Sequence, residues 1–153
     1  MTRLPRREGA FRVPRATSDD GVFEVDATWG TVWPLEVAPG VATVGELEVI
    51  AHLEAGLPLC DTRPYPAFAQ GTLPGAFHVH HEQIVERMGE LDRQRATVMF
   101  CNGPQCSATP WAIGRLLAAG YPAHALRFYR GGLHDWITLG YPIVIPAAAG
   151  TEA

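Results

Sequence analysis

The fold is decided by residues 96–107, which read Ala-Thr-Val-Met-Phe-Cys-Asn-Gly-Pro-Gln-Cys-Ser. The first six residues are almost continuously apolar, which is expected of a strand covered on both faces. A tight Gly-Pro turn ends the strand. Ser107 then begins a predicted helix that runs to about residue 119 and ends at Gly120. A buried strand, a short loop and a helix in this order form one unit of a parallel α/β sheet.

The same alternation of strands and helices extends to both sides of this unit. Strands are predicted at 41–43, 57–61, 76–79 and 125–129, and helices from about 46 to 55, 82 to 91 and 131 to 139. Thr43 and Glu46 have the spacing of a capping box for the first helix. Its inward residues would be Leu47, Ile50, Ala51 and Leu53. The pattern predicts an α/β fold, with a parallel sheet between two layers of helices.

The chain has 153 residues, which argues for one domain with attached segments. Residues 1–20 are rich in Arg and Pro and are predicted to be a basic, flexible arm. Residues 21–40 are predicted to be an irregular extension packed on the core, in which Trp29 and Trp33 cover apolar surface or serve as a ligand platform. The domain proper would span 41–145, with a tail at 146–153.

Charge and composition exclude several classes of protein. Apolar residues make up 47% of the chain, too many for a wholly disordered protein. All twelve basic residues are Arg, and five of them lie in the first fifteen residues, so the remainder is acidic. Because the acidic body carries no basic stripe, we expect no nucleic-acid binding, although the basic tip could contact phosphate or anionic lipid.

Localisation is predicted from the apolar runs and the cysteines. No apolar run approaches the roughly 18 residues of a membrane span, and the arginine-rich start lacks the apolar core of a secretion signal. Three cysteines, an odd number, do not suggest a disulfide framework. We therefore expect a cytoplasmic protein with free thiols and no membrane span.

Cys101 is the strongest candidate for chemistry. It is the last residue of the central strand, and ligands bind at the carboxyl ends of parallel strands. The loop after it can direct several backbone N–H groups to one point at the positive end of a helix. Such a nest would lower the pKa of the Cys101 thiol and favour the nucleophilic thiolate. The alternative is a buried cysteine with a structural role only.

Several further motifs, in order over residues 41–145, resemble the rhodanese homology domain. They are Asp61-Thr-Arg63, Gly71-Thr-Leu-Pro-Gly-Ala76, Phe100-Cys101 with its loop to Ser107, and Gly131-Gly132 followed by Trp136, Gly140 and Pro142. The resemblance implies a rhodanese-like fold with a five-stranded parallel sheet flanked by helices on both faces. It also implies sulfurtransferase activity of the thiosulfate sulfurtransferase (rhodanese) type.

In that family a sulfane sulfur is captured as a persulfide on the catalytic cysteine and passed to an acceptor, without a cofactor. By resemblance, Cys101 is catalytic and Asp61 shapes the loops near the site. The donor would be thiosulfate or a persulfide, and the acceptor a thiol, cyanide or a protein. Substrate would be bound by Asn102, Gly103, Pro104, Gln105, Cys106, Ser107, Arg63 and Arg130.

Two residues depart from the family pattern. Thr72 stands where the family usually has His. The loop also has no cation, whereas many thiosulfate-using members carry Arg or Lys there. Capture of the thiosulfate dianion would therefore be weak or would rely on Arg63 or Arg130. The sixth residue after Cys101 is Ser107, so the Cys-x5-Arg motif of phosphatases on this fold is absent.

Alternatives remain for the other polar residues and for the whole chain. His78, His80 and His81 could join cysteines in a zinc site, but the spacing is loose and we expect no metal. Cys60 is predicted to be a core residue. Cys106 either lends its backbone N–H to the nest or acts as a resolving thiol. The alternative to an enzyme is a non-catalytic rhodanese-like binding or sulfur-carrier module that acts in a complex.

Overall fold

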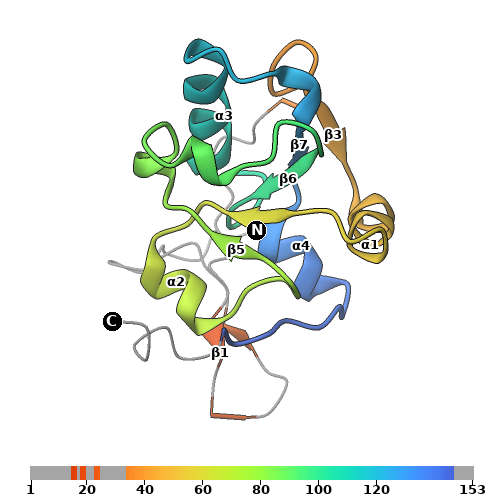
Figure 1. Ribbon diagram of the computed structural model, residues 1–153. Helices are drawn as coiled ribbons and strands as arrows, with labels where there is room; N and C mark the ends of the chain where they lie inside the picture. The colour runs from red at the N-terminus through yellow and green to blue at the C-terminus, as the bar shows by residue number, and fades with distance from the viewer. Residues whose placement is uncertain (1–14, 17, 20–22, 25–33, 147–153) are drawn as a thin grey trace, which may run out of the picture.

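The computed structural model describes residues 15–16, 18–19, 23–24 and 34–146 (Figure 1). Its central feature is a five-stranded sheet in which every pairing is parallel. The strands are β3 (Ala42–Val44), β4 (Leu59–Asp61), β5 (Phe77–His78), β6 (Thr97–Phe100) and β7 (Leu126–Tyr129), in the spatial order β3-β7-β6-β4-β5. The predicted sheet is thereby confirmed, and the strand 96–101 is its centre.

Helices cover both faces of this sheet. They are α1 (Glu46–Glu54), α2 (Tyr65–Gln70), α3 (Ala108–Ala118) and α4 (Gly132–Thr138), with 3-10 turns η1 (His81–Gln83), η2 (Met88–Glu90) and η3 (Ala123–Ala125). Figure 1 shows α3 on one side of the sheet and α1 and α4 on the other.

The core consists of two clusters, one on each face, because neighbouring residues of a strand point to opposite sides. On β6, Met99 joins the cluster under α3, whereas Val98 and Phe100 join the cluster under α1 and α4. All four residues of β6 are fully buried. This explains the unbroken apolar run, and it fixes the end of β6 between two helical layers.

Two details of the predicted helices are wrong. The predicted helix 82–91 is instead the two turns η1 and η2, whose N–H groups mostly bond three residues back. Ile84 and Leu91 are still buried as the periodicity required. The predicted capping box is also displaced: the cap of α1 is Gly45, whose N–H donates to the Glu48 carboxylate.

The face that α1 buries agrees only in part with the prediction. Ile50 and Leu53 pack against the core as predicted, but Leu47, which is 75% exposed, and Ala51 face solvent. The fully buried side chains of α1 are Val49 and His52. The short helix α2 was not predicted. It begins at Tyr65 after Pro64, because proline is tolerated in the first turn of a helix.

The N-terminal region contributes one described feature. Two-residue strands β1 (Arg15–Ala16) and β2 (Phe23–Glu24) pair antiparallel. Most of the predicted arm and extension, including Trp29 and Trp33, and most of the predicted tail lie outside the described residues, so these segment boundaries stay predictions.

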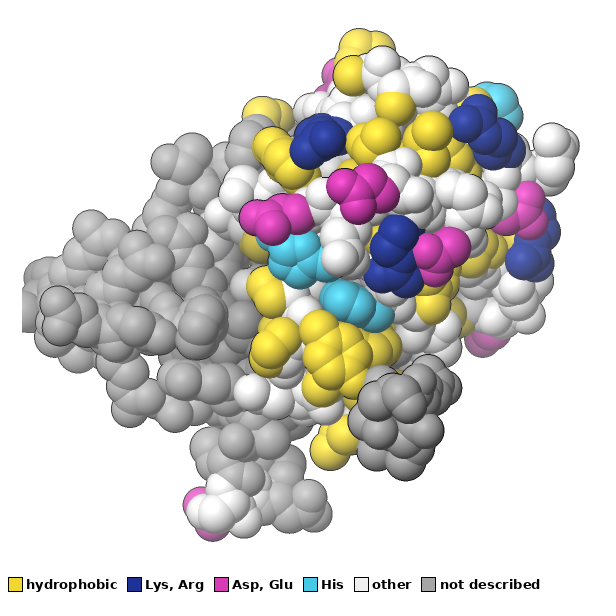
Figure 2. Space-filling model, turned by 60° about the vertical axis from the view of Figure 1, so that its left-hand side comes forward, with side chains coloured by type: hydrophobic (Ala, Val, Ile, Leu, Met, Phe, Trp, Pro, Cys, Tyr) yellow, Lys and Arg dark blue, Asp and Glu magenta, His cyan; other side chains and the backbone are white. Residues whose placement is uncertain are grey.

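The described surface is mixed in charge. On the face shown in Figure 2, basic and acidic side chains lie next to one another and form no single-sign stripe. Ion pairs of this kind include Arg87–Glu90 and Arg95–Asp92. No helix among the residues described is both long and apolar enough to cross a bilayer.

Candidate active site

The loop 101–107 begins where β6 ends and is held by the start of α4. The backbone N–H of Leu133 donates to the Cys101 carbonyl oxygen at 3.1 Å, and that of His134 donates to the Asn102 carbonyl oxygen at 2.8 Å. The first N–H groups of a helix have no partner within the helix, so they are available for such contacts. The two bonds fix the beginning of the loop against α4.

Gly132 makes this close approach possible. Its φ is +61°, a left-handed conformation that glycine adopts without strain. A Cβ atom at this position would lie 2.5 Å from the Cys101 oxygen, 2.8 Å from the Gly103 nitrogen and 2.9 Å from the Asn102 carbonyl carbon. All three are backbone atoms. The second glycine of the Gly131-Gly132 motif therefore allows α4 to lie directly against the loop.

The loop turns back on itself and brings two thiols together. The Cys106 N–H donates to the Gly103 carbonyl oxygen at 3.0 Å, which closes a tight turn. The Cys101 sulfur lies 3.8 Å from the Cys106 carbonyl oxygen, and the ionisation of each of the two thiols depends on the other. Cys101 is buried at 2% exposure, whereas Cys106 is only half-buried.

The negative charge of this pair rests on Cys106. The hydrogen bond from Cys101, with N–H groups of Ala108 and Asn102 and the nearby charge of Arg63, lowers the pKa of Cys106 to about 6. Burial, followed by the proximity of Cys106, raises the pKa of Cys101. The expected lowering of the Cys101 pKa is therefore wrong for the resting pair, because the loop directs its donors mainly to the second sulfur.

Thr109, in the first turn of α3, was missed by the sequence reasoning. Its hydroxyl and its backbone N–H act on the Cys101 sulfur and favour the thiolate, against the effect of burial on the pKa of Cys101. The same hydroxyl lies 2.8 Å from that of Thr62, which in turn donates to the Phe100 carbonyl oxygen at 3.1 Å. The signal for Thr109 was its place one turn into the helix that starts beside the loop, where side chains and N–H groups point back at the strand end.

Asp61 and Arg63 form a buried network beside the loop. Arg63 donates from Nε and Nη2 to the Asp61 carboxylate, with a shortest distance of 2.6 Å, and from Nη2 to the Gly71 carbonyl oxygen at 2.6 Å. Both side chains are essentially inaccessible to solvent. Thr72, which stands in place of the family histidine, donates to Asp61 at 2.8 Å. His78 completes the network through its Nε2 contact with the Arg63 carbonyl oxygen.

These hydrogen bonds hold the Asp61 and Arg63 side chains in fixed positions beside the loop 101–107. Only Nη1 of the Arg63 guanidinium is buried without a hydrogen-bond partner, and the charge of Arg63 acts on Cys106. Asp61 lies opposite Phe100 in the register of β4 with β6, so the network lies one residue from Cys101. The site is therefore flanked by a cation whose charge Asp61 largely balances.

The structure also places the remaining predicted site residues. Gly103, Pro104 and Gln105 are buried in the loop, and Ser107 is exposed. Ser107 begins α3 but makes no side-chain cap; its carbonyl accepts from the Trp111 N–H. Arg130 directly follows β7 at the same edge of the sheet and is half-buried.

Cys60 lies apart from the two loop thiols. It belongs to β4 and is fully buried in the cluster under α3, and this burial raises its pKa strongly. No disulfide joins the three cysteines. In the part of the chain that the structure describes, no three His, Cys, Asp or Glu side chains come together as metal ligands.

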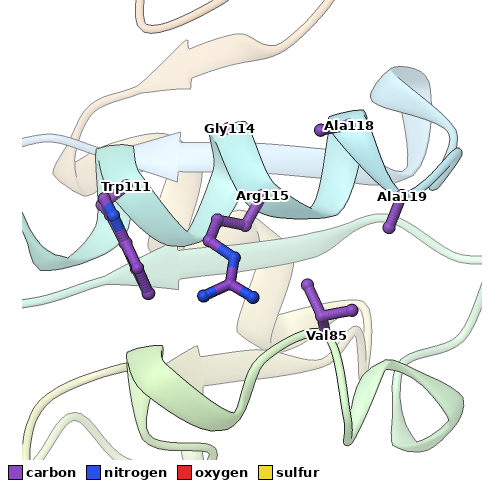
Figure 3. A pocket seen from close by; sticks show the side chains of 6 residues that line it. All are labelled: Val85, Trp111, Gly114, Arg115, Ala118 and Ala119. Atoms are coloured by element: carbon purple, nitrogen blue, oxygen red, sulfur yellow. The ribbon is translucent and has the colours of Figure 1, made fainter.

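A shallow groove of about 560 Å³ runs along the outer face of α3 (Figure 3). Trp111, Arg115 and Val85 line it, and the Arg115 guanidinium carbon lies 4.7 Å from the centre of the Trp111 ring. The other lining residues are glycine and alanine. Because this lining holds no thiol, hydroxyl, carboxylate or imidazole, the groove offers no group of the kind that the loop 101–107 provides.

Known proteins share both the sequence and the fold. The chain is 30% identical over 104 residues to an HTH-type transcriptional regulator of Mycobacterium tuberculosis, Rv0324; the match covers 67% of this chain and 45% of the regulator. It is 34% identical to a sulfurtransferase of Allochromatium vinosum, with 58% and 78% covered. The chain thus spans less than half of the regulator.

Solved structures share the fold of this chain. A thiosulfate sulfurtransferase of Pseudomonas aeruginosa superposes with a TM-score of 0.59 at 26% identity, covering 70% of this chain and 21% of that one. The Alr3790 protein of Anabaena sp. superposes with a TM-score of 0.61 at 22% identity, with 71% and 87% covered. The family model described as a rhodanese-like domain matches residues 46–139, which include β4, the two-thiol loop and α4. The chain therefore belongs to the rhodanese-like domain family.

Proposed function

We propose that the protein is a sulfurtransferase that takes a sulfane sulfur from thiosulfate or a small persulfide and passes it to a thiophilic acceptor. The sulfur would be carried as a persulfide on Cys101. The observation that supports this proposal is the geometry of the loop 101–107, which holds the buried Cys101 sulfur 3.8 Å from the Cys106 carbonyl oxygen, while backbone N–H groups favour a thiolate on Cys106.

The first half-reaction is the capture of sulfur. The Cys106 thiolate accepts the proton of the neighbouring Cys101 thiol. The Cys101 thiolate then attacks the sulfane sulfur of the donor, the bond between that sulfur and the rest of the donor breaks, and the donor leaves with the electron pair. From thiosulfate the leaving group is sulfite. This proton transfer would convert the buried Cys101 thiol, whose pKa is raised, into the thiolate that acts as the nucleophile.

The second half-reaction regenerates the thiol. The acceptor attacks the outer sulfur of the persulfide, and the Cys101 thiolate is the leaving group. Thr109 stabilises this thiolate through its hydroxyl and N–H. Since donor and acceptor react in turn through a covalent intermediate, we expect ping-pong kinetics.

The charges around the loop favour a thiol-derived donor over thiosulfate. Thiosulfate is a dianion, and the loop itself holds no cation. The nearby Arg63 is paired with Asp61, which reduces the charge available to a second anion. Arg130, at the same edge of the sheet, is the other basic residue that could assist. The acceptor class includes small thiols, cyanide and a protein thiol.

The test compares sulfur transfer in two single variants. Cys101→Ser should abolish transfer to cyanide from both thiosulfate and a small persulfide, and it should no longer gain the mass of one sulfur atom after treatment with either donor. Cys60→Ala is the matched control, because it removes a buried thiol outside the loop, and it should retain transfer. An active Cys101→Ser protein would exclude the proposed carrier.

A second candidate function is supported by the likeness to the transcriptional regulator of M. tuberculosis. In this reading the domain serves a partner protein as a binding or sulfur-carrier module and has no turnover of its own. The same variants separate the two. A pure binding module would show no persulfide with either donor, and Cys101→Ser would leave partner binding unchanged.

A further inference from the structure

Sulfur transfer to an external acceptor uses Cys106 only as a proton acceptor. Transfer needs a proton acceptor beside Cys101, but a second thiol is itself a sulfur nucleophile. Its side chain is half-buried, and the turn closed by the Cys106 N–H on Gly103 holds its backbone against the Cys101 sulfur. The nearest acceptor for a persulfide on Cys101 is therefore within the same loop.

We propose that Cys106 resolves the Cys101 persulfide, so that the protein releases hydrosulfide and forms a disulfide between Cys101 and Cys106. This inference rests on the proposed function, because it starts from the persulfide that the first half-reaction makes. It adds a second product and a second co-substrate, a dithiol reductant that reopens the disulfide.

The step balances in atoms and electrons. The Cys106 sulfur attacks the inner sulfur of the persulfide, the one that belongs to Cys101. A bond forms between the two cysteine sulfurs, and the bond to the outer sulfur breaks with its electron pair. The outer sulfur is reduced and leaves as hydrosulfide, taking the proton that Cys106 accepted during capture. The two cysteine sulfurs are together oxidised by two electrons, which a dithiol of the thioredoxin class returns by exchange.

Geometry favours this step over direct attack by a large external thiol. The Cys101 sulfur is in contact with the Cys106 backbone, 3.8 Å from its carbonyl oxygen, and a disulfide requires the two sulfurs to approach to about 2.05 Å. Cys101 is 2% exposed, so a bulky thiol reaches its sulfur poorly. Cys106 is the more accessible of the two. An exchange partner would therefore attack the Cys106 sulfur of the disulfide and release the Cys101 thiolate.

The alternative role for Cys106 is to supply the proton acceptor and its backbone N–H only. In that case the persulfide would persist until an external acceptor removed it. The two roles differ in one product, hydrosulfide released without any added acceptor.

The experiment is a single turnover of the full chain without reductant. Reduced protein is treated with excess thiosulfate, desalted and followed by intact mass, peptide mapping and hydrosulfide trapping. We expect the Cys60→Ala protein to release about one hydrosulfide per persulfide formed, to lose two hydrogen atoms in mass, and to show an intramolecular 101–106 disulfide that thioredoxin or dithiothreitol reverses. Cys60→Ala serves as the reference because it leaves only the two loop thiols.

Cys106→Ser, in the same Cys60→Ala background, tests the role of the second sulfur. Because Cys106 is also the proton acceptor in capture, this variant should form the persulfide more slowly, so it is loaded by longer treatment with thiosulfate and both products are counted per persulfide formed. Its hydrosulfide yield per persulfide should fall at least about ten-fold, and the persulfide that has formed should still pass its sulfur to cyanide. Cys106→Ala repeats the test if the serine protein is unstable. A stable persulfide in the reference protein, or equal hydrosulfide release from the Cys106 variants, would refute resolution and leave the sulfurtransferase proposal standing. Absence of persulfide, of hydrosulfide and of transfer to cyanide in the reference protein would refute both.

Discussion

Replacing Gly132, the first residue of α4, by alanine should displace the loop 101–107. At Gly132 the added Cβ meets three backbone atoms of the loop at 2.5–2.9 Å. Backbone cannot rotate away as a flexible side chain can, so either α4 or the loop must move. Because the N–H groups of Leu133 and His134 hold the loop, the movement would loosen both bonds.

The magnitude follows from two separate costs. An alanine in a left-handed conformation costs about 1 kcal/mol. Forcing a methyl group into a filled space costs a further ~1–3 kcal/mol. We therefore expect Gly132→Ala to lower the free energy of unfolding by about 2–4 kcal/mol. At roughly 4 °C per kcal/mol for a domain of this size, the Tm should fall by about 8–16 °C.

Gly140→Ala is the matched control. Gly140 lies just beyond the other end of α4 with a φ of +81°, and its Cβ would meet nothing within 4 Å. It should show only the conformational cost, about 1 kcal/mol. Urea unfolding of both variants and their sulfur transfer to cyanide measure the difference. Equal destabilisation, or full transfer activity in Gly132→Ala, would refute the role of the close contact between α4 and the loop.

Three further predictions concern the network, the thiols and the arm. Asp61→Asn leaves the Arg63 guanidinium buried without its counter-ion and should lower the free energy of unfolding by about 3–5 kcal/mol. Asp92→Asn, in an exposed ion pair, should leave the Tm almost unchanged. Equal effects of the two substitutions would contradict the structural role of the network. Because the Cys101 hydrogen bond lowers the pKa of Cys106 to about 6, its alkylation by iodoacetamide should be near maximal at pH 7 and fall as the pH drops below that pKa; a rate that still rises steeply between pH 8 and 9 would place the thiolate elsewhere. Deletion of residues 2–20 should change the Tm little, and a loss of cooperative unfolding would show that the arm belongs to the core.

The fold could be predicted from the sequence where burial is complete. β6 is covered on both faces, so its apolar run has one interpretation, and the loop and helix after it follow from Gly, Pro and Ser. The prediction failed where a segment lies at the edge of the core. Between residues 81 and 91 the apolar residues have helical spacing, yet the chain forms 3-10 turns, because spacing reports which side chains are buried and not which hydrogen bonds form.

The position of the candidate site could be predicted from the sequence, but not which of its two sulfurs carries the negative charge. Cys101 at the end of the central strand and the loop after it follow from the rule that parallel strands present their carboxyl ends to ligands. Which sulfur carries the charge depends on where Ala108 and Asn102 aim their N–H groups, and that direction is a property of the folded turn. Thr109 was missed for the same reason. Its contact with Cys101 requires the first turn of α3 to lie over the end of β6.

The absence of a cation from the loop and the presence of a second thiol favour the same class of substrate. A loop arginine would stabilise a thiolate and attract a dianionic donor at the same time. Here the thiolate is stabilised first by a hydrogen bond from its neighbour, Cys101, and by backbone N–H groups, which do little for a dianion arriving from solvent. Arg63, the cation that acts on the pair, is largely balanced by Asp61. We therefore expect donors and acceptors that are derived from thiols. The proposed disulfide between Cys101 and Cys106 belongs to the same thiol chemistry. Preference for a small persulfide over thiosulfate, measured as the ratio of kcat/KM values, would follow from this arrangement, and the opposite preference would show that Arg63 or Arg130 supplies the charge that the loop lacks.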